Sequence, residues 1–586
     1  MFCKHPLGVD VVIYAFLKFT LMTMKNFKKF LFALSCGAFA MSLNAAELKV
    51  AGGTTLDITE GFYEIGDYGD YSTAMINGTL NWTPAADSAW KEFVIYAEND
   101  YTKGVNTVTV YGKFNAKGDM YLNAGRIKVA GILDNTGNYF EMGSDGKAYL
   151  LITGNGATAS FGDMNIKGGT YSNVRVEYGG TLNANNITVH QNNTESQAVL
   201  SMNQGGTINA NKITAEVNAL IQIGKGTINV KDINVAGQSK NEKGRLELGT
   251  GAELNINGGT SSVLANTTIA SGAVLNVNAG KVSTYGVGAL ALNGGYLNIA
   301  DGASIVVENA AMVDEASNYT FVVGGGKQDN PSKIDIKGSG FIHLANSQGG
   351  NDMKMGDYSG KYGYVHIRAD RQGSIISDKI TFINSGTGKD STMVLNSKNI
   401  FVGSKAYDSS SLEYVEGYEN NRANFDTMIV LGSSVSAEIV VNADSAFGAV
   451  SYQQNCELIL TLGDTGVISF TEFQQGYAFE NASYARLTIN EFENNRVFIE
   501  NMAEVGDVIG TKSNLKLAIT ATLSDNLAKY YDDVTYTNVD FEMVAGEHNG
   551  VSGYWLNISA IVPEPAEWAA IFGAVALAFA MYRRRK

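Results

Sequence analysis

The segment HIRADR, residues 366–371, holds the densest set of side chains that could do acid–base chemistry. Side chains alternate along a strand, so His366, Arg368 and Asp370 would share one face, with Arg371 beside them. Enzymes that cut polysaccharides use such sets, in which carboxylates act as an acid–base pair or as Ca²⁺ ligands near an Arg, Lys or His. A solvated strand face would have the same pattern, and we favour that simpler interpretation.

Other candidate residues are scattered along the chain. The acidic pairs Asp314/Glu315 and Asp532/Asp533 lie in polar stretches, which are typical of solvated loops. The sequence has no phosphate loop, no G-x-S-x-G elbow and no H-E-x-x-H motif. The histidines beyond residue 45 are too far apart in the sequence for a local zinc motif: His190, His343, His366 and His548. We therefore expect no enzyme activity, no catalytic residue, no cofactor and no bound metal.

A repeat runs through the centre of the chain and would position any functional residues. The segments 180–189, 206–215 and 226–235 read GTLNANNITV, GTINANKITA and GTINVKDINV, and they align without gaps. An internal repeat of this length predicts a solenoid in place of a single closed core. The aliphatic residue before the shared Asn recurs every 20 to 26 residues, enough for one coil of three short strands: Leu182, Ile208, Ile228, Leu254, Leu275 and Leu297.

Smaller features predict how each coil is built. Two apolar residues, separated by one position, recur seven or eight residues before the aliphatic residue of the next repeated strand. A Gly lies between this apolar pair and that strand. The pairs are Leu200/Met202, Ile221/Ile223, Leu246/Leu248 and Leu290/Leu292. Strand, turn, strand, turn, strand is the order in a right-handed parallel β-helix, with alternate aliphatic residues inside. The shared Asn residues would then stack ~4.8 Å apart and hydrogen-bond as a ladder: Asn183, Asn209, Asn229, Asn255, Asn276 and Asn298.

The expected protein is all-β, with a single transmembrane helix at its carboxyl end and room for a short loop-helix around Ser524 to Asp532. Residues 1–45 would be a leader with a signal peptide, and residues 46–115 an amino-terminal β cap over the open end of the solenoid. Residues 116–426 would form the parallel β-helix. Residues 427–562 would be a further β region, either the end of the solenoid or a separate domain. Residues 563–586 would be a sorting and anchoring segment.

The leader has the parts of a secretory signal peptide. From Met24 it reads MKNFKKFLFALSCGAFAMSLNA, with a basic start, an apolar core and a small residue at Ala45. We expect signal peptidase to cut between Ala45 and Ala46, and Met24 to be the true start. Residues 1–23 would in that case belong to an overlong gene model; otherwise they would extend the signal. An uncleaved amino-terminal anchor is the alternative.

The exported body would be strongly acidic. The chain has a formal net charge of −15; the leader contributes four net positive charges and residues 563–586 two, which leaves −21 for the body. This charge argues against nucleic acid or anionic lipid as a partner bound through a basic surface. Cys3 and Cys36 lie in the leader, so only Cys456 remains and the body can form no internal disulfide.

The last residues of the chain differ from the body. Pro563, Glu564 and Pro565 should be extended and accessible, because proline fixes φ and cannot continue a helix. The run from Trp568 to Tyr582 is uncharged and, with the residue pair before it, reaches the lower edge of the ~17 to 25 residues that cross a bilayer. A core helix is the alternative. The positive cluster that follows should stay on the cytoplasmic side: Arg583, Arg584, Arg585 and Lys586.

This tail resembles the PEP-CTERM sorting domain of exopolysaccharide-producing Gram-negative bacteria, because it has VPEP, an apolar span and RRRK in this order. The resemblance covers only this tail. It implies that Pro563-Glu564-Pro565 is recognised by exosortase, a membrane cysteine protease-transpeptidase that cuts near the motif. It also implies that Trp568 to Tyr582 anchor the chain only transiently in the inner membrane. The repeats resemble autotransporter passenger coils, but the helix-type span at the end of this chain disfavours that secretion route.

These patterns predict an exported, exosortase-sorted surface protein with a structural or adhesive role in the envelope or exopolysaccharide matrix. It would reach the cell envelope, the outer surface or the extracellular matrix. Its expected partners are signal peptidase, exosortase, and exopolysaccharide or other surface glycans, with no nucleic acid. A β-helix polysaccharide lyase or hydrolase is one alternative, and a protein that binds carbohydrate through exposed Tyr residues is another.

Overall fold

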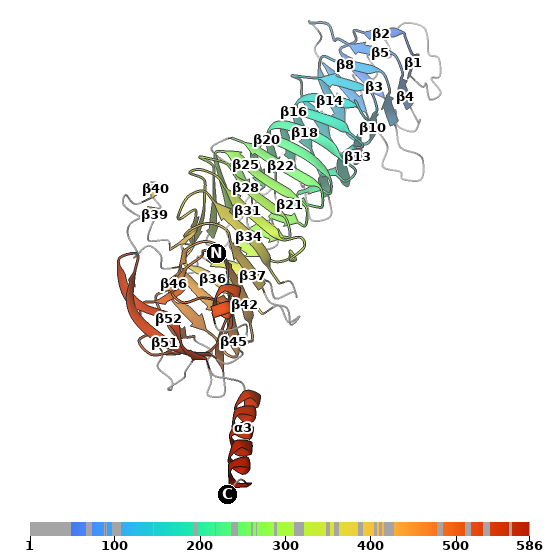
Figure 1. Ribbon diagram of the computed structural model, residues 1–586. Coiled ribbons are helices and arrows are strands. Elements are labelled where there is room, and N and C mark those ends of the chain that lie inside the picture. The colour runs from blue at the N-terminus through green and yellow to red at the C-terminus, as the bar shows by residue number, and fades with distance from the viewer. Residues whose placement is uncertain are drawn as a thin grey trace, which may run out of the picture. The chain divides into compact units, whose positions relative to one another are not determined.

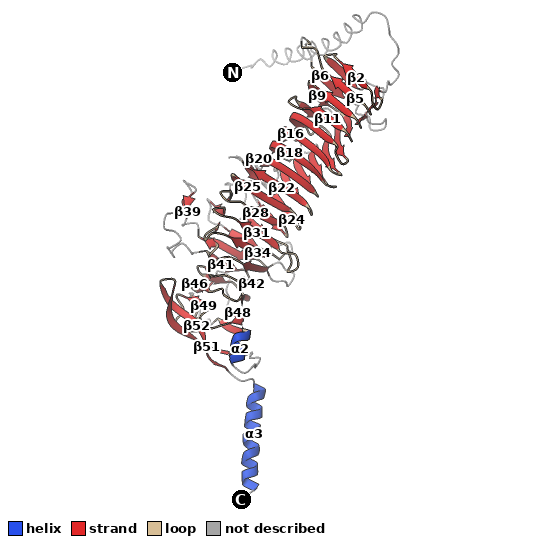
Figure 2. Cartoon of the chain, turned by 45° about the horizontal axis from the view of Figure 1, so that its top comes forward, coloured by secondary structure: helices blue, strands red, loops and turns tan. Residues whose placement is uncertain are grey.

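The computed structural model describes residues 48–65, 73–86, 88, 91–95, 107–144, 146–190, 197–216, 218–235, 244–258, 262–264, 267–285, 290–309, 321–346, 352–356, 362–384, 391–403, 407–408, 413–414, 427–476, 484–509, 517–530, 539–561 and 565–584. Met24, Ala45 and Ala46 lie outside these residues. The described chain is mostly β-strand, as the sequence predicts, and parallel sheets dominate it (Figures 1 and 2).

The strands stack into three faces, here called A, B and C. Face A contains one strand from each coil: β1 (Leu48–Val50), β4 (Thr73–Ile76), β7 (Thr107–Val110), β10 (Gly125–Val129), β13 (Lys147–Thr153), β15 (Tyr171–Glu177), β17 (Gln197–Met202), β19 (Leu220–Ile223), β21 (Arg245–Leu248), β24 (Thr267–Ala270), β27 (Leu290–Asn293), β30 (Phe321–Val323), β33 (Asp352–Met355), β36 (Lys379–Phe382), β41 (Met428–Leu431), β44 (Val450–Tyr452) and β47 (Phe473–Gln475).

Face B follows face A along the chain in each coil. It contains β2 (Thr55–Ile58), β5 (Thr79–Trp82), β8 (Lys113–Ala116), β11 (Ile132–Asn135), β14 (Thr158–Ile166), β16 (Gly180–Val189), β18 (Gly206–Ala215), β20 (Gly226–Val235), β22 (Ala252–Asn257), β25 (Val274–Ala279), β28 (Tyr296–Ile299), β31 (Ser332–Ile336), β34 (Tyr364–Ala369), β37 (Ser391–Leu395), β42 (Ser436–Val441), β45 (Cys456–Leu462), β48 (Ala485–Phe492) and β50 (Ala518–Leu523).

Face C completes the coil, and the long strands β14, β16, β18 and β20 run on from face B into it. Its other strands are short: β3 (Phe62–Ile65), β6 (Glu92–Ile95), β9 (Asp119–Leu122), β12 (Phe140–Met142), β23 (Ser262–Leu264), β26 (Lys281–Tyr285), β29 (Ser304–Asn309), β32 (Phe341–Asn346), β35 (Ile375–Ile376), β38 (Phe401–Val402), β43 (Ser445–Ala446), β46 (Ile468–Phe470) and β49 (Val497–Ile499).

The remaining elements do not belong to the repeating coils. They are β39 (Tyr407–Asp408), β40 (Glu413–Tyr414), α2 (Asp525–Tyr530), β51 (Val539–His548), β52 (Val551–Ile561) and α3 (Pro565–Arg584). Of these, β52 pairs with β49 at the end of face C. β39 and β40 pair antiparallel with each other, and so do β51 and β52.

The repeated aliphatic residues form the core, as the sequence predicts. The register of face B pairs Leu182 with Ile208, Ile208 with Ile228, and so on to Leu297. All six side chains are fully buried. On face A the apolar pair Leu200/Met202 stacks on Ile221/Ile223 in the same way. Burial of alternate residues in every coil is the main force that holds such a solenoid together. The prediction of a parallel β-helix-like repeat is therefore confirmed.

Glycines permit the tight corner between faces A and B in the first coils. Gly78, Gly112 and Gly131 occupy this corner in three successive coils, each between an A strand and a B strand. A Cβ on Gly112 would lie 2.0 Å from the carbonyl oxygen of Gly78, and one on Gly131 would lie 2.1 Å from that of Gly112. Only glycine lets the backbones of neighbouring coils approach this closely.

The predicted asparagine ladder is present on the outer side of face B. The Nδ2 of Asn209 donates to Oδ1 of Asn183 over 2.9 Å, and Asn229 donates to Asn209 over 2.9 Å. The same bond continues through Asn255 and Asn276 to Asn298, with distances of 3.0, 2.7 and 2.7 Å. Every amide donates to the preceding coil, so the rungs all point in one direction.

Aspartate interrupts this ladder at two positions. Asn81 donates to Asp57 and Asn115 donates to Asn81, but Asp134 occupies the next rung. Asp335 likewise follows Asn298 in register. An ionised carboxylate has no hydrogen to donate. Accordingly, Oδ1 of Asn115 is buried and makes no hydrogen bond. Oδ1 of Asp335 is also buried without a hydrogen bond, so this acceptor receives no donor from a neighbouring coil.

Parallel pairing reaches into both flanking regions of the sequence. The strands β1 to β7, within residues 46–115, pair in parallel with strands of the following coils. Beyond residue 427, β41 pairs in parallel with β36 and begins three further coils that end at β49. On face B, β50 still pairs in parallel with β48. On face C the parallel order ends at β49, because β52 lies antiparallel to it and forms a hairpin with β51.

Candidate functional site

The predicted sorting segment is described only in part. Four of its residues lie outside the described chain: Pro563, Glu564, Arg585 and Lys586. α3 begins at Pro565 and ends at Arg584, so Trp568, Tyr582 and Arg583 belong to a helix. Its side chains are described from Phe572 onward, where Phe572 is 64% and Phe579 is 71% exposed. Among the described residues, no helix is both long enough and apolar enough to cross a membrane.

β34 places the HIRADR side chains as strand alternation predicts. His366 and Arg368 point outward from face B, Asp370 follows on the same side, and Val365 and Ile367 are buried. Nη2 of Arg368 lies 3.7 Å from Oδ1 of Asp370, and both side chains are exposed. The other oxygen of Asp370 accepts a hydrogen bond from the backbone N–H of Gly338 over 3.1 Å. The acidic side chain is thus held by its own strand and by the neighbouring coil.

The surroundings of His366 are cationic. Lys333 lies beside it in register on β31, while Asp335 lies beside Arg368. Partial burial, and then the charge of Lys333, lower the pKa of His366 below its usual value. The acidic pairs Asp314/Glu315 and Asp532/Asp533 lie outside the described residues. The strand therefore presents one exposed ion pair next to a neutral imidazole, without a facing pair of carboxylates.

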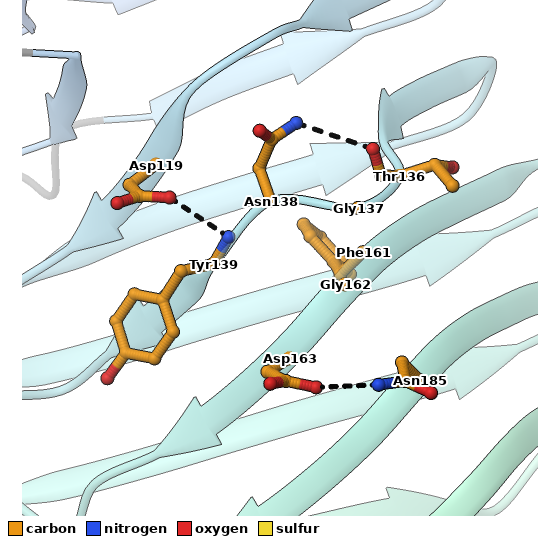
Figure 3. A pocket seen from close by; sticks show the side chains of 9 residues that line it. All are labelled: Asp119, Thr136, Gly137, Asn138, Tyr139, Phe161, Gly162, Asp163 and Asn185. Carbon is orange, nitrogen blue, oxygen red and sulfur yellow. Dashed lines mark hydrogen bonds between the residues drawn. The ribbon is translucent and has the colours of Figure 1, made fainter.

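A polar hollow of about 530 Å³ opens near the corner between faces B and C (Figure 3). Asp119 of β9 accepts a hydrogen bond from the backbone N–H of Tyr139 over 3.1 Å. Asp163 of β14 accepts one from Nδ2 of Asn185 over 3.0 Å. The turn between β11 and β12 lies between these two walls. The full lining is Asp119, Thr136, Gly137, Asn138, Tyr139, Phe161, Gly162, Asp163 and Asn185.

Side chains next to the hollow continue its acidic character over face C. The hydroxyl of Tyr139 donates to Oε2 of Glu141 over 2.6 Å, and Nζ of Lys167 lies 2.9 Å from the same oxygen. Burial, and then the bond to Glu141, raise the pKa of Tyr139 well above its usual value. Burial, and then the charge of Asp119, raise the pKa of Glu92. The hollow thus offers hydroxyl, amide and carboxylate groups. Its two carboxylates, Asp119 and Asp163, already accept hydrogen bonds from neighbouring residues.

The histidines of the described chain serve separate local contacts. Nδ1 of His190 lies 2.7 Å from Oε2 of Glu216, and its Nε2 lies 2.8 Å from Oδ1 of Asn165. His343 is buried, at 4% exposure. Within the described residues, no three His, Cys, Asp or Glu side chains are placed to hold a metal ion.

The sequence interpretation missed the hollow, because its walls come from coils whose outward residues do not repeat. Asp119 and Asp163 are 44 positions apart and come together only through the register of three coils. A scan of known protein families found none that matches this chain, and a search of curated proteins found no relative.

Proposed function

We propose that this chain is an exported surface protein, sorted by an exosortase, with a structural or adhesive role in the envelope or exopolysaccharide matrix. One observation carries the proposal: the order Pro563-Glu564-Pro565, apolar run and basic end follows a long parallel β body in one chain. This order suits delivery of the body to a surface, where a solenoid offers long faces for contact.

In this proposal the tail is a temporary anchor. The span is the whole run from Ala566 to Tyr582, of which side chains are described only from Phe572. The exposed apolar side chains of α3 support this role, because a contiguous apolar surface is normally covered by a membrane or a partner. Arg583 to Lys586 would remain on the cytoplasmic side of the inner membrane until exosortase cuts near the Pro-Glu-Pro motif.

The body would act as a scaffold. Its coils are joined by backbone pairing and by the asparagine ladder, which supports a structural role without a disulfide. We infer that the coils are right-handed, since connections between parallel strands are right-handed almost without exception.

Mass spectrometry of the carboxyl terminus tests the sorting proposal. The chain, expressed in a host that has an exosortase, is recovered from the inner membrane and from the cell surface. We expect surface-located protein to lack the MYRRRK end, and Pro563→Ala with Pro565→Ala to keep that end and remain in the inner membrane.

Pro331→Ala is the matched control, because it removes a proline from the body and leaves the tail unchanged. Normal processing of this control is expected. An intact MYRRRK end on surface-located protein would overturn the proposal, and so would normal processing of the double variant.

A further inference from the structure

Face A of the early coils carries cations and tyrosines, although the body as a whole is acidic. We call these outward side chains of β10, β13 and β15 the A strip: Arg126, Lys128, Lys147, Tyr149, Tyr171 and Arg175. The four strands β7, β10, β13 and β15 contain one carboxylate, Glu177, which is only 6% exposed and forms an ion pair with Arg175. The A strip is therefore a positive surface.

Contacts within the A strip position three of its side chains, Arg126, Tyr149 and Tyr171. Tyr149 lies beside Arg126 in register, and the Arg126 Cζ lies 5.6 Å from the centre of the Tyr149 ring. The Tyr149 and Tyr171 rings are 5.8 Å apart, and Asn173 donates to the Tyr171 hydroxyl over 3.0 Å. Ordering charged and aromatic groups in advance lowers the entropy that a ligand must overcome on binding.

The opposite sign lies on face C, in coils that partly overlap those of the A strip and partly precede them. Face C carries Glu92, Asp119 and Glu141, in strands that pair directly with one another. Asp163 follows on β14. The carboxylates thus gather on face C and the cations of the A strip on face A, although Lys167 pairs with Glu141. An anionic ligand that approaches the coils would be attracted to face A and repelled from face C.

We infer that the A strip binds an acidic polysaccharide whose chain runs along the stack of coils. Neighbouring coils are ~4.8 Å apart, close to the length of one sugar residue in an extended chain. One carboxylate of a polyuronate would meet Arg126 and Lys128 on β10 and the next would meet Lys147 on β13, while tyrosine rings pack on the sugar rings. This inference rests on the proposed function and names the class of matrix glycan involved.

The test measures binding of the full chain, kept soluble in a mild non-ionic detergent, to immobilised polygalacturonate. The same polymer with its carboxyls methyl-esterified is the neutral probe. We expect binding that weakens with added NaCl and is lost on the esterified polymer. Arg126→Gln with Lys128→Gln should lower the affinity about tenfold. Tyr149→Ala should also lower it, whereas Tyr149→Phe keeps the ring and the binding.

Arg245→Gln is the matched control, because Arg245 is an exposed arginine on β21 of the same face and belongs to no part of the A strip. An equal loss of affinity in this control would overturn the inference. Tighter binding to a single-stranded oligonucleotide or to phosphatidylserine vesicles would do the same, and so would absence of binding to polygalacturonate. Circular dichroism of each variant confirms that it is folded.

The sorting proposal and the glycan-binding proposal can be overturned independently of each other. If the tail is removed at the surface but polygalacturonate is not bound, the glycan class is wrong and the sorting proposal stands. If polygalacturonate binds the A strip but surface protein keeps its MYRRRK end, the sorting proposal is wrong and the binding site stands.

Discussion

Asn209 is an inner rung of the ladder, and its amide both donates and accepts. It gives one hydrogen bond to Asn183 and receives one from Asn229. We predict that Asn209→Ala lowers the free energy of unfolding by about 1 to 2 kcal/mol, since two half-buried bonds are lost. Urea unfolding followed by circular dichroism measures the effect. Lys212→Ala, exposed on the same strand, should leave the midpoint unchanged; an equal shift there would refute a specific role for the ladder.

The burial of His343 predicts how the free energy of unfolding depends on pH. Burial lowers its pKa to about 4, while Asp378 acts to raise it and Lys281 to lower it further. A histidine in the unfolded chain has a pKa near ~6.5, so between these values the unfolded state binds the proton more readily. The contribution of His343 is therefore complete above pH ~6.5 and is lost as the pH falls toward about 4, by about 3 kcal/mol in total.

The measurement compares the original chain with His343→Gln in urea titrations from pH 7 to pH 4.5. Both proteins share every carboxylate, so the difference between their pH profiles isolates His343. We expect the variant to lose less stability across this window. Parallel profiles would show that His343 does not titrate in this way.

At the level of the element, the β51–β52 hairpin ends the parallel stack. Trp555 of β52 packs on Phe498 of β49, with ring centres 4.9 Å apart, and Leu556 is fully buried. A solenoid needs such a cover, because its last coil would otherwise expose an apolar interior and unpaired strand edges.

A substitution at Gly553 tests whether the hairpin stabilises the end of the stack. A Cβ at this position would lie 2.6 Å from the Phe498 ring and 2.9 Å from the Cα of Glu500. We predict that Gly553→Val displaces the hairpin, lowers the melting temperature by several degrees and promotes self-association, as seen by calorimetry and size-exclusion chromatography. Ser552→Val adds the same side chain at an exposed neighbouring position. If Ser552→Val has the same effect, the displacement of the hairpin is not the cause.

The strands that the sequence predicted best are those whose residues recur. Leu182, Ile208 and Ile228 revealed the inner side of face B, and the Asn beside each one revealed its outer side, because equivalent positions stack when a repeat closes into coils. The A strip could not be found in this way. Arg126 and Tyr149 are 23 positions apart and belong to no repeated motif, so only the register of β10 and β13 brings them together.

For the whole molecule, net charge was a poor guide to surface chemistry. The value of −15 is a sum over faces that differ in sign. It correctly describes face C around Glu92 and Asp119, but not face A around Arg126 and Lys128. Net charge ignores which way a side chain points, and in a solenoid the direction is fixed by the coil.

The two aspartates that interrupt the ladder also bear on mechanics. In the proposed surface role the chain would be loaded by tension, and stacked coils resist tension through the bonds between neighbours. Side-chain bonds join each coil to the next from Asn183 to Asn298, whereas Asp134 and Asp335 leave a polar oxygen without a bond. Under force the coils should therefore separate first beside these two aspartates, so that the solenoid yields in segments and the block between them stays intact.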